Sequence, residues 1–160
     1  MGRPRQGNCP VGSCFLWRSV AVKVKEFIET CPFLKEFEQA TFPVVNMDVL
    51  EDQPTMYSIE ETPADPIIKR YANGDSVRQY VFSLCSRELY GPAENEDTAK
   101  FYEKFSDWLE DCTREGILPV LSGQLQSKSI RATTNGYLYD NEGTSCQYRI
   151  QCQFIYFKRR

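Results

Sequence analysis

Two pairs of neighbouring carboxylates are the first residues in this 160-residue chain that could do chemistry, because paired acids serve general acid–base catalysis. Glu60 and Glu61 lie in an alternating stretch that predicts a strand, so their side chains point to opposite faces. Glu110 and Asp111 are neighbours on a predicted helix, about 100° apart around its axis. Neither pair therefore predicts a catalytic dyad.

Other catalytic motifs are missing from the sequence. It contains no histidine, which removes the commonest general base and the commonest metal ligand. Hydrolases with a histidine-activated serine or cysteine are thereby excluded. Neither phosphate-binding glycine pattern is present, and Gly12-Ser13-Cys14 lacks the flanking strand and helix of a nucleophile elbow. We expect no enzyme activity, no cofactor and no metal ion.

Cysteine usage indicates a reduced protein. The seven cysteines include no Cys-x-x-Cys pair, and the Cys9–Cys14 spacing has no second ligand pair to complete a metal site. Cys31, Cys112 and Cys152 fall on apolar patterns, where a free thiol behaves as a small hydrophobe. Buried, reduced cysteines predict assembly in a reducing cytosol.

Charge is distributed unevenly along the chain, although the formal net charge is only −3. Residues 48–65 contain six acids and no lysine or arginine, and residues 88–115 contain nine acids against three basic residues. The last three residues are all basic. This pattern is not that of a protein gripping phosphate backbones over a wide face. It indicates either solvated loops or a subunit with one acidic and one basic end, suited to stacking on a partner.

The chain is predicted to hold one domain, residues 19–160. Residues 1–18 are rich in glycine and proline, and we expect them to be a disordered or loosely attached N-terminal extension. Their only apolar run, residues 14–17, is too short for a signal-peptide core. No run approaches the length of a membrane span, so no membrane partner is expected.

Two helices are predicted from apolar residues at helical spacing. One runs over residues 19–30 and stops before Pro32. The other runs over residues 96–115, with Asn95 or Asp97 as the N-cap and Gly116 just past its end.

Strands are predicted where apolar residues alternate. Residues 56–60 form one, residues 67–72 and 76–86 form a hairpin around Asn73-Gly74, and two long arms cover residues 127–140 and 144–158. Gly136 is expected at a bulge. The predicted fold class is α+β: a mainly antiparallel four- to five-stranded sheet with two principal helices on one face, in the order α-β-β(-β)-α-β-β.

Some predicted strands are apolar on both faces, although two helices can cover only one. The second face would carry Val81 and Cys85 of one strand, and Ile155 and Phe157 of another. Either the loops in residues 32–54 or another subunit must cover these groups, because monomers rarely expose large apolar patches. Tyr137 and Tyr139 are further candidates for surface aromatics at an interface.

Several blocks of sequence resemble one known family. They fall in order along residues 20–157: 27–34, 57–60, 65–69, 75–80, 86–88, 101–105, 133–137 and 148–156. Together they are similar to the tail terminator proteins (minor capsid or tail completion proteins) of tailed phages and prophages of Gram-positive bacteria.

The resemblance implies a structural virion protein at the neck of the tail, made in the bacterial cytoplasm. Such proteins form a ring, usually a homohexamer, that caps the tail tube, ends its polymerisation and offers a head–tail joining surface. The implied partners are further copies of the chain, the tail tube protein, head-completion or neck proteins and, in contractile tails, the sheath protein. The mechanism is assembly by surface complementarity without turnover.

DNA would pass through the ring without specific binding, and acids lining the lumen would keep it from sticking. The candidate lumen acids are Asp48, Glu51, Asp52, Glu94, Glu96 and Asp97. Alternatives stay open at this stage: a neck or head-completion adaptor of the same particle, a monomeric binding module, or a small enzyme that uses carboxylates or a cysteine.

Overall fold

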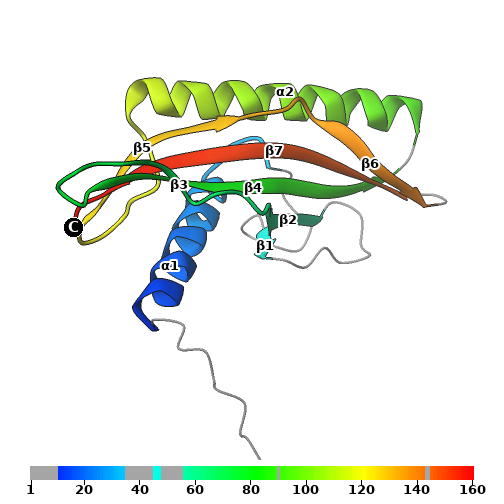
Figure 1. The fold of residues 1–160 in the computed structure, drawn as a ribbon. Helices are drawn as coiled ribbons and strands as arrows, with labels where there is room; N and C mark the ends of the chain where they lie inside the picture. Colours follow the sequence, from blue (N-terminus) through cyan, green and yellow to red (C-terminus); the bar gives the residue numbers. More distant parts are fainter. Residues whose placement is uncertain (1–10, 35–44, 48–55, 90, 143–144) are drawn as a thin grey trace, which may run out of the picture.

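The computed structural model describes residues 11–34, 45–47, 56–89, 91–142 and 145–160, and shows an α+β architecture (Figure 1). The elements follow in the order α1 (Val11–Ile28), β1 (Val45–Met47), β2 (Met56–Glu61), β3 (Ile67–Arg70), β4 (Ser76–Leu89), α2 (Pro92–Glu115), β5 (Leu125–Ala132), β6 (Tyr137–Glu142) and β7 (Ser145–Lys158).

The seven strands form one mainly antiparallel sheet. Its path is β1-β2-β4-β7-β5, with β3 pairing β4 beyond the end of β2 and β6 pairing β7 beyond the end of β5. The β1–β2 pair alone is parallel among the pairs described. The predicted mainly antiparallel α+β class is confirmed. The count of four to five strands is wrong, because β1 was not predicted and the predicted arm over residues 127–140 forms two strands, β5 and β6.

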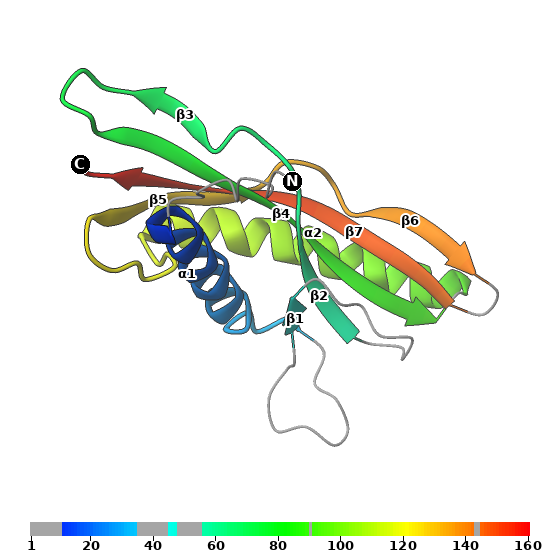
Figure 2. The ribbon, with the colours of Figure 1, turned by 60° about the horizontal axis from the view of Figure 1, so that its bottom comes forward.

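The core occupies one face of this sheet. Phe82 and Leu84 of β4 and Ile150 and Phe154 of β7 belong to one buried cluster with side chains of both helices. Burial alternates along β7, with the even-numbered residues from 146 to 156 turned inward as predicted. The two helices meet where the rings of Phe27 and Trp108 stack at 5.1 Å. In Figure 2, α2 runs along the sheet behind β4 and β7.

Helix α1 begins earlier than predicted. Its first residue is Val11 rather than Ser19, so residues 11–18, which we expected to be a disordered or loosely attached extension, are helical. Residues 1–10 lie outside the described part of the chain. The predicted apolar stripe is buried: Val20, Val24 and Ile28 are at most 1% exposed.

Helix α2 ends as predicted but begins differently. Its N-cap is Gly91, followed by Pro92, instead of Asn95 or Asp97. Proline fits the first turn because its fixed φ is helical and its missing N–H would have no partner there. At the other end, Gly116 takes the left-handed conformation at φ 74°, and the N–H of Ile117 donates to the carbonyl of Cys112.

The predicted hairpin is confirmed, and the predicted long arm over residues 127–140 is not. Gly74 turns the β3–β4 hairpin at φ 92°. The long arm is divided into β5 and β6, because the chain at Gly136 passes close over the side chain of Tyr102. A Cβ at Gly136 would lie 2.5 Å from Cβ of Tyr102, which is closer than two carbon atoms can approach. Only glycine therefore fits between the chain at this point and the Tyr102 side chain of α2.

Two kinds of feature are not found among the described residues. None of the helices there is long and apolar enough to cross a membrane. No group of three or more acidic or cysteine side chains within the described ranges is placed to hold a metal ion.

Candidate interaction surface

The sheet face opposite the core, here called the outer face, is the candidate functional surface. Figure 1 shows its two long strands, β4 and β7, with no helix drawn over them. The outer face is formed by the odd-numbered residues of these strands: Val77, Gln79, Val81, Ser83, Cys85, Arg87, Gln147, Arg149, Gln151, Gln153, Ile155 and Phe157.

Strand register brings the predicted interface residues onto this one face. Arg149 of β7 pairs with Cys85 on one side and with Tyr137 on the other. Phe157 pairs with Val77, and Ile155 pairs with Gln79. Paired residues point to the same side of a sheet, so residues from three separate strands share a surface.

Accessibility divides these predicted residues into two groups. Tyr137 and Tyr139 are 42% and 56% exposed, and Ile155 and Phe157 are partly exposed. Cys85 is fully buried and Val81 is 9% exposed, so both lie beneath the surface among larger neighbours. A partner could contact the first four, whereas Val81 and Cys85 support the face from within.

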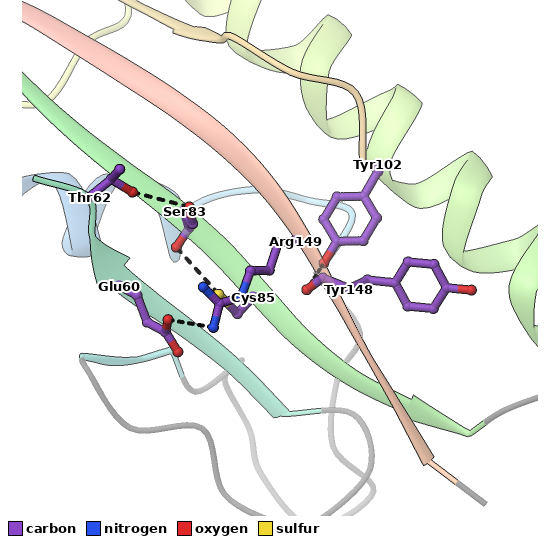
Figure 3. A network of polar contacts seen from close by, with 7 residues as sticks. All are labelled: Glu60, Thr62, Ser83, Cys85, Tyr102, Tyr148 and Arg149. Carbon is purple, nitrogen blue, oxygen red and sulfur yellow. Dashed lines mark hydrogen bonds and ion pairs between the residues drawn. The ribbon is translucent and has the colours of Figure 1, made fainter. Parts of the chain in front are cut away.

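The centre of the outer face is polar and held by Arg149 (Figure 3). Its Nη2 lies 2.9 Å from Oε2 of Glu60 on β2. Its guanidinium carbon lies 3.6 Å from the centre of the Tyr139 ring. Through these two contacts, the Arg149 side chain of β7 links β2 and β6 across the outer face.

Burial beneath Arg149 also sets the chemistry of Cys85. Loss of solvation raises the pKa of the Cys85 thiol to about 12, and the Glu60 carboxylate adds to the rise. Burial likewise raises the pKa of Cys31 to about 11. At neutral pH both are protonated thiols, which are poor nucleophiles.

The end of the outer face nearest the C-terminus is aromatic and basic. The rings of Tyr71 and Phe157 lie 6.1 Å apart. The ammonium of Lys69 lies 4.9 Å from the Tyr71 ring centre, and that of Lys128 lies 5.7 Å from the Phe157 ring centre. One face of each ring therefore lies against a cation of the same chain.

The core face has a polar network of its own, which is structural. The hydroxyls of Tyr102 and Ser86 lie 2.7 Å apart, and Tyr102 also donates to the carbonyl of Tyr148 at 3.3 Å. The Tyr148 hydroxyl donates to Oδ1 of Asn95. These bonds fasten α2 to β4 and β7 and satisfy polar groups that burial would otherwise leave unpaired.

The predicted lumen acids are described only in part. Asp48, Glu51 and Asp52 lie outside the described residues, as does the side chain of Glu94. Glu96 is exposed but forms a 2.7 Å ion pair with Lys100. Asp97 borders a shallow hollow together with Lys100 and Lys104. Lysines therefore accompany both of the described acids.

A set of basic residues that are distant in sequence lie close together in the fold, and the sequence pattern did not predict this. They lie around the end of the sheet where β3, β5 and β7 meet the C-terminus: Lys69, Arg70, Arg78, Lys128, Lys158, Arg159 and Arg160. Of these, the sequence signalled only the last three as a basic run. The hydrophobic pattern gave no signal that strands distant in sequence would bring the others alongside.

Comparisons with known proteins do not assign a family. No family model and no curated protein matches the chain. Eight chains among solved structures match it. One of them covers 92% of this chain and 96% of its own length, at 14% identity and a TM-score of 0.42. A likeness at that level carries no argument about function.

Proposed function

We propose that this chain is a structural virion subunit that forms a ring, usually six copies in proteins of this kind, on the end of a phage tail tube. The ring ends tube polymerisation and presents the surface to which head-completion or neck proteins join. The subunit works by surface complementarity and has no catalytic turnover.

One observation supports the proposal above the others: the outer face carries accessible apolar and aromatic groups on a rigid sheet. Ile155 and Phe157 lie partly exposed on β7, and Tyr137 and Tyr139 lie exposed on the neighbouring β6. Subunit interfaces are enriched in such aromatics.

The arrangement of titratable groups favours a structural role over the enzymatic alternative. The Glu60 carboxylate forms an ion pair with Arg149. Burial raises the pKa of the Cys31 and Cys85 thiols, so both are protonated at neutral pH. Acid–base or thiolate chemistry would need groups poised near neutrality.

The proposal is tested by native mass spectrometry of the purified chain and by electron microscopy of the chain on tail tubes of its own particle. The double variant Ile155→Glu and Phe157→Glu places charge on the outer face and is expected to abolish the ring while leaving a folded monomer.

The matched control is Ile117→Glu with Val120→Glu. These apolar residues are 57% and 81% exposed after α2, away from the outer face. The control should assemble as the wild type does. A wild-type chain that remains monomeric on tail tubes would overturn the proposal.

A further inference from the structure

The basic end of the sheet, made of Lys69, Arg70, Arg78, Lys128, Lys158, Arg159 and Arg160, carries a surplus of positive charge. Within the described residues, none of these seven side chains forms an ion pair. The Asp75 carboxylate also lies at this end, where it accepts hydrogen bonds from the backbone N–H of Arg160 and the side-chain amide of Asn73, so it offsets part of the charge. The remaining cations repel one another, at a cost in stability that an acidic partner could relieve.

Crowding of like charges is evident at the centre of this end. Arg78 and Lys158 lie on the same side of neighbouring strands. Partial burial lowers the pKa of Lys158, and the positive charge of Arg78 lowers that pKa further. Two cations held this close favour an anionic neighbour.

A complementary acidic surface exists on the same chain. Glu103, Asp107 and Glu110 follow one another at helical spacing on the exposed side of α2. None of the three makes a hydrogen bond or ion pair with any described residue. We call these three residues the acidic stripe.

No lysine or arginine of α2 forms an ion pair with the acidic stripe among the described residues. Lys100 pairs with Glu96, and Arg114 pairs with Asp111. Lys104 lies 5.9 Å from the centre of the Phe33 ring. These cations are three or four residues from stripe acids and screen part of their charge, but the three carboxylates keep their hydrogen-bonding capacity for a partner.

We propose that the basic end of one copy docks on the acidic stripe of a second copy. The two patches are different surfaces of one chain, so the contact is head-to-tail and each copy keeps one patch free for the next. Contacts of this type generate a ring when the rotation closes. The inference rests on the proposed ring function and specifies the surfaces through which the copies meet.

A protein partner fits the basic end better than single-stranded DNA does. Non-specific binding of single strands uses aromatic faces on which bases stack. At this end Lys69 lies over one face of Tyr71 and Lys128 over one face of Phe157, where each would compete with a stacking base. The side chain of Ile68, 48% exposed on β3, adds apolar surface of the kind found within protein interfaces.

Charge swapping tests this docking directly, because every substituted side chain is exposed. One variant carries Lys69→Glu, Arg70→Glu and Lys128→Glu. A second carries Glu103→Lys, Asp107→Lys and Glu110→Lys. A third carries all six changes and keeps the wild-type net charge. Circular dichroism first establishes that each variant is folded, and sedimentation velocity then measures self-association at physiological salt.

Each triple variant should self-associate about a hundredfold more weakly than the wild type, because like charges would face one another. The variant with all six substitutions should regain association, and so should an equal mixture of the two triple variants. Salt at about 1 M, where the Debye length is about 3 Å, should weaken the wild-type contact.

Three results would overturn the inference. Triple variants that associate like the wild type would place the contact elsewhere and leave the ring itself standing. A monomeric wild type would remove the contact, and the assay on tail tubes would then decide the ring separately. Loss of binding to labelled duplex DNA in the first variant, with unchanged self-association, would assign the basic end to DNA instead.

Discussion

Arg149 of β7 reaches across the whole width of β4 to form its 2.9 Å ion pair with Glu60 of β2. It passes over Cys85, its own register partner, which is fully buried beneath it. Strands in a sheet lie about 4.8 Å apart, so the pair joins strands that make no direct hydrogen bond. The outer face thereby gains a rigid centre between its aromatic edges.

The Glu60–Arg149 pair should show measurable coupling in a double-mutant cycle with Glu60→Gln and Arg149→Met. The side chains are 28% and 19% exposed, so we expect each single change to lower the unfolding free energy by about 1–2 kcal/mol, with about 1 kcal/mol of coupling. Chemical denaturation measures all four proteins. The exposed Lys23–Glu26 pair is the control and should couple by less than about 0.5 kcal/mol. Equal coupling in both pairs would contradict this account.

Gly136→Ala should destabilise the protein through a steric clash. The added Cβ would meet the base of the Tyr102 ring, which cannot move without breaking its hydrogen bonds. We expect a loss of about 2–3 kcal/mol in unfolding free energy, measured by urea titration.

Gly116→Ala is the matched control for that clash. It has open space around the new Cβ but a φ of 74°, so it should lose only about 1 kcal/mol from backbone strain. If Gly136→Ala costs no more than Gly116→Ala, the close approach to Tyr102 is not what divides β5 from β6.

Elements with local signals were predictable, and those that depend on distant contacts were not. The alternation of β7, the Asn73-Gly74 turn and Gly116 each carry their signal within a few residues. The division of the long arm depends on Tyr102, which is far from Gly136 in sequence. The basic end likewise forms only when β3, β5 and β7 are placed side by side. Val81 and Cys85 were correctly placed on the outer face, but their burial depends on distant residues: Cys85 lies beneath Arg149, and Val81 lies beside Gln153 of β7 and Thr62 after β2.

Tyr102→Phe should cost stability through the buried hydrogen bond to Ser86. Removing the Tyr102 hydroxyl leaves the fully buried Ser86 hydroxyl without that partner, at an expected cost of about 1–2 kcal/mol. Adding Ser86→Ala to Tyr102→Phe should then cost less than Ser86→Ala alone. Thermal unfolding of the four proteins measures this, and strict additivity would show that the two hydroxyls do not depend on each other.

Alkaline pH should destabilise the fold through its buried thiols. Their ordinary pKa of 9.0 applies after unfolding, while burial raises the folded pKa to about 11 for Cys31 and about 12 for Cys85. Below about pH 9 both states are protonated and the full stability is present. As pH rises from about 9 towards the folded values, each thiol lowers the unfolding free energy by about 1.4 kcal/mol per pH unit.

Urea titrations from pH 8 to pH 10.5 measure that slope. Cys85→Ala lowers stability at every pH but should reduce the slope by the equivalent of one proton. An unchanged slope in Cys85→Ala would show that Cys85 ionises equally well in the folded state.

The most direct test of the account is electron microscopy of the chain's own particle, which shows the shape that the chain forms on the tail tube. We predict a closed ring of identical copies at the end of the tube, lost in the Ile155→Glu, Phe157→Glu variant and kept in the Ile117→Glu, Val120→Glu control. A chain that stays monomeric beside tubes of unregulated length would contradict it.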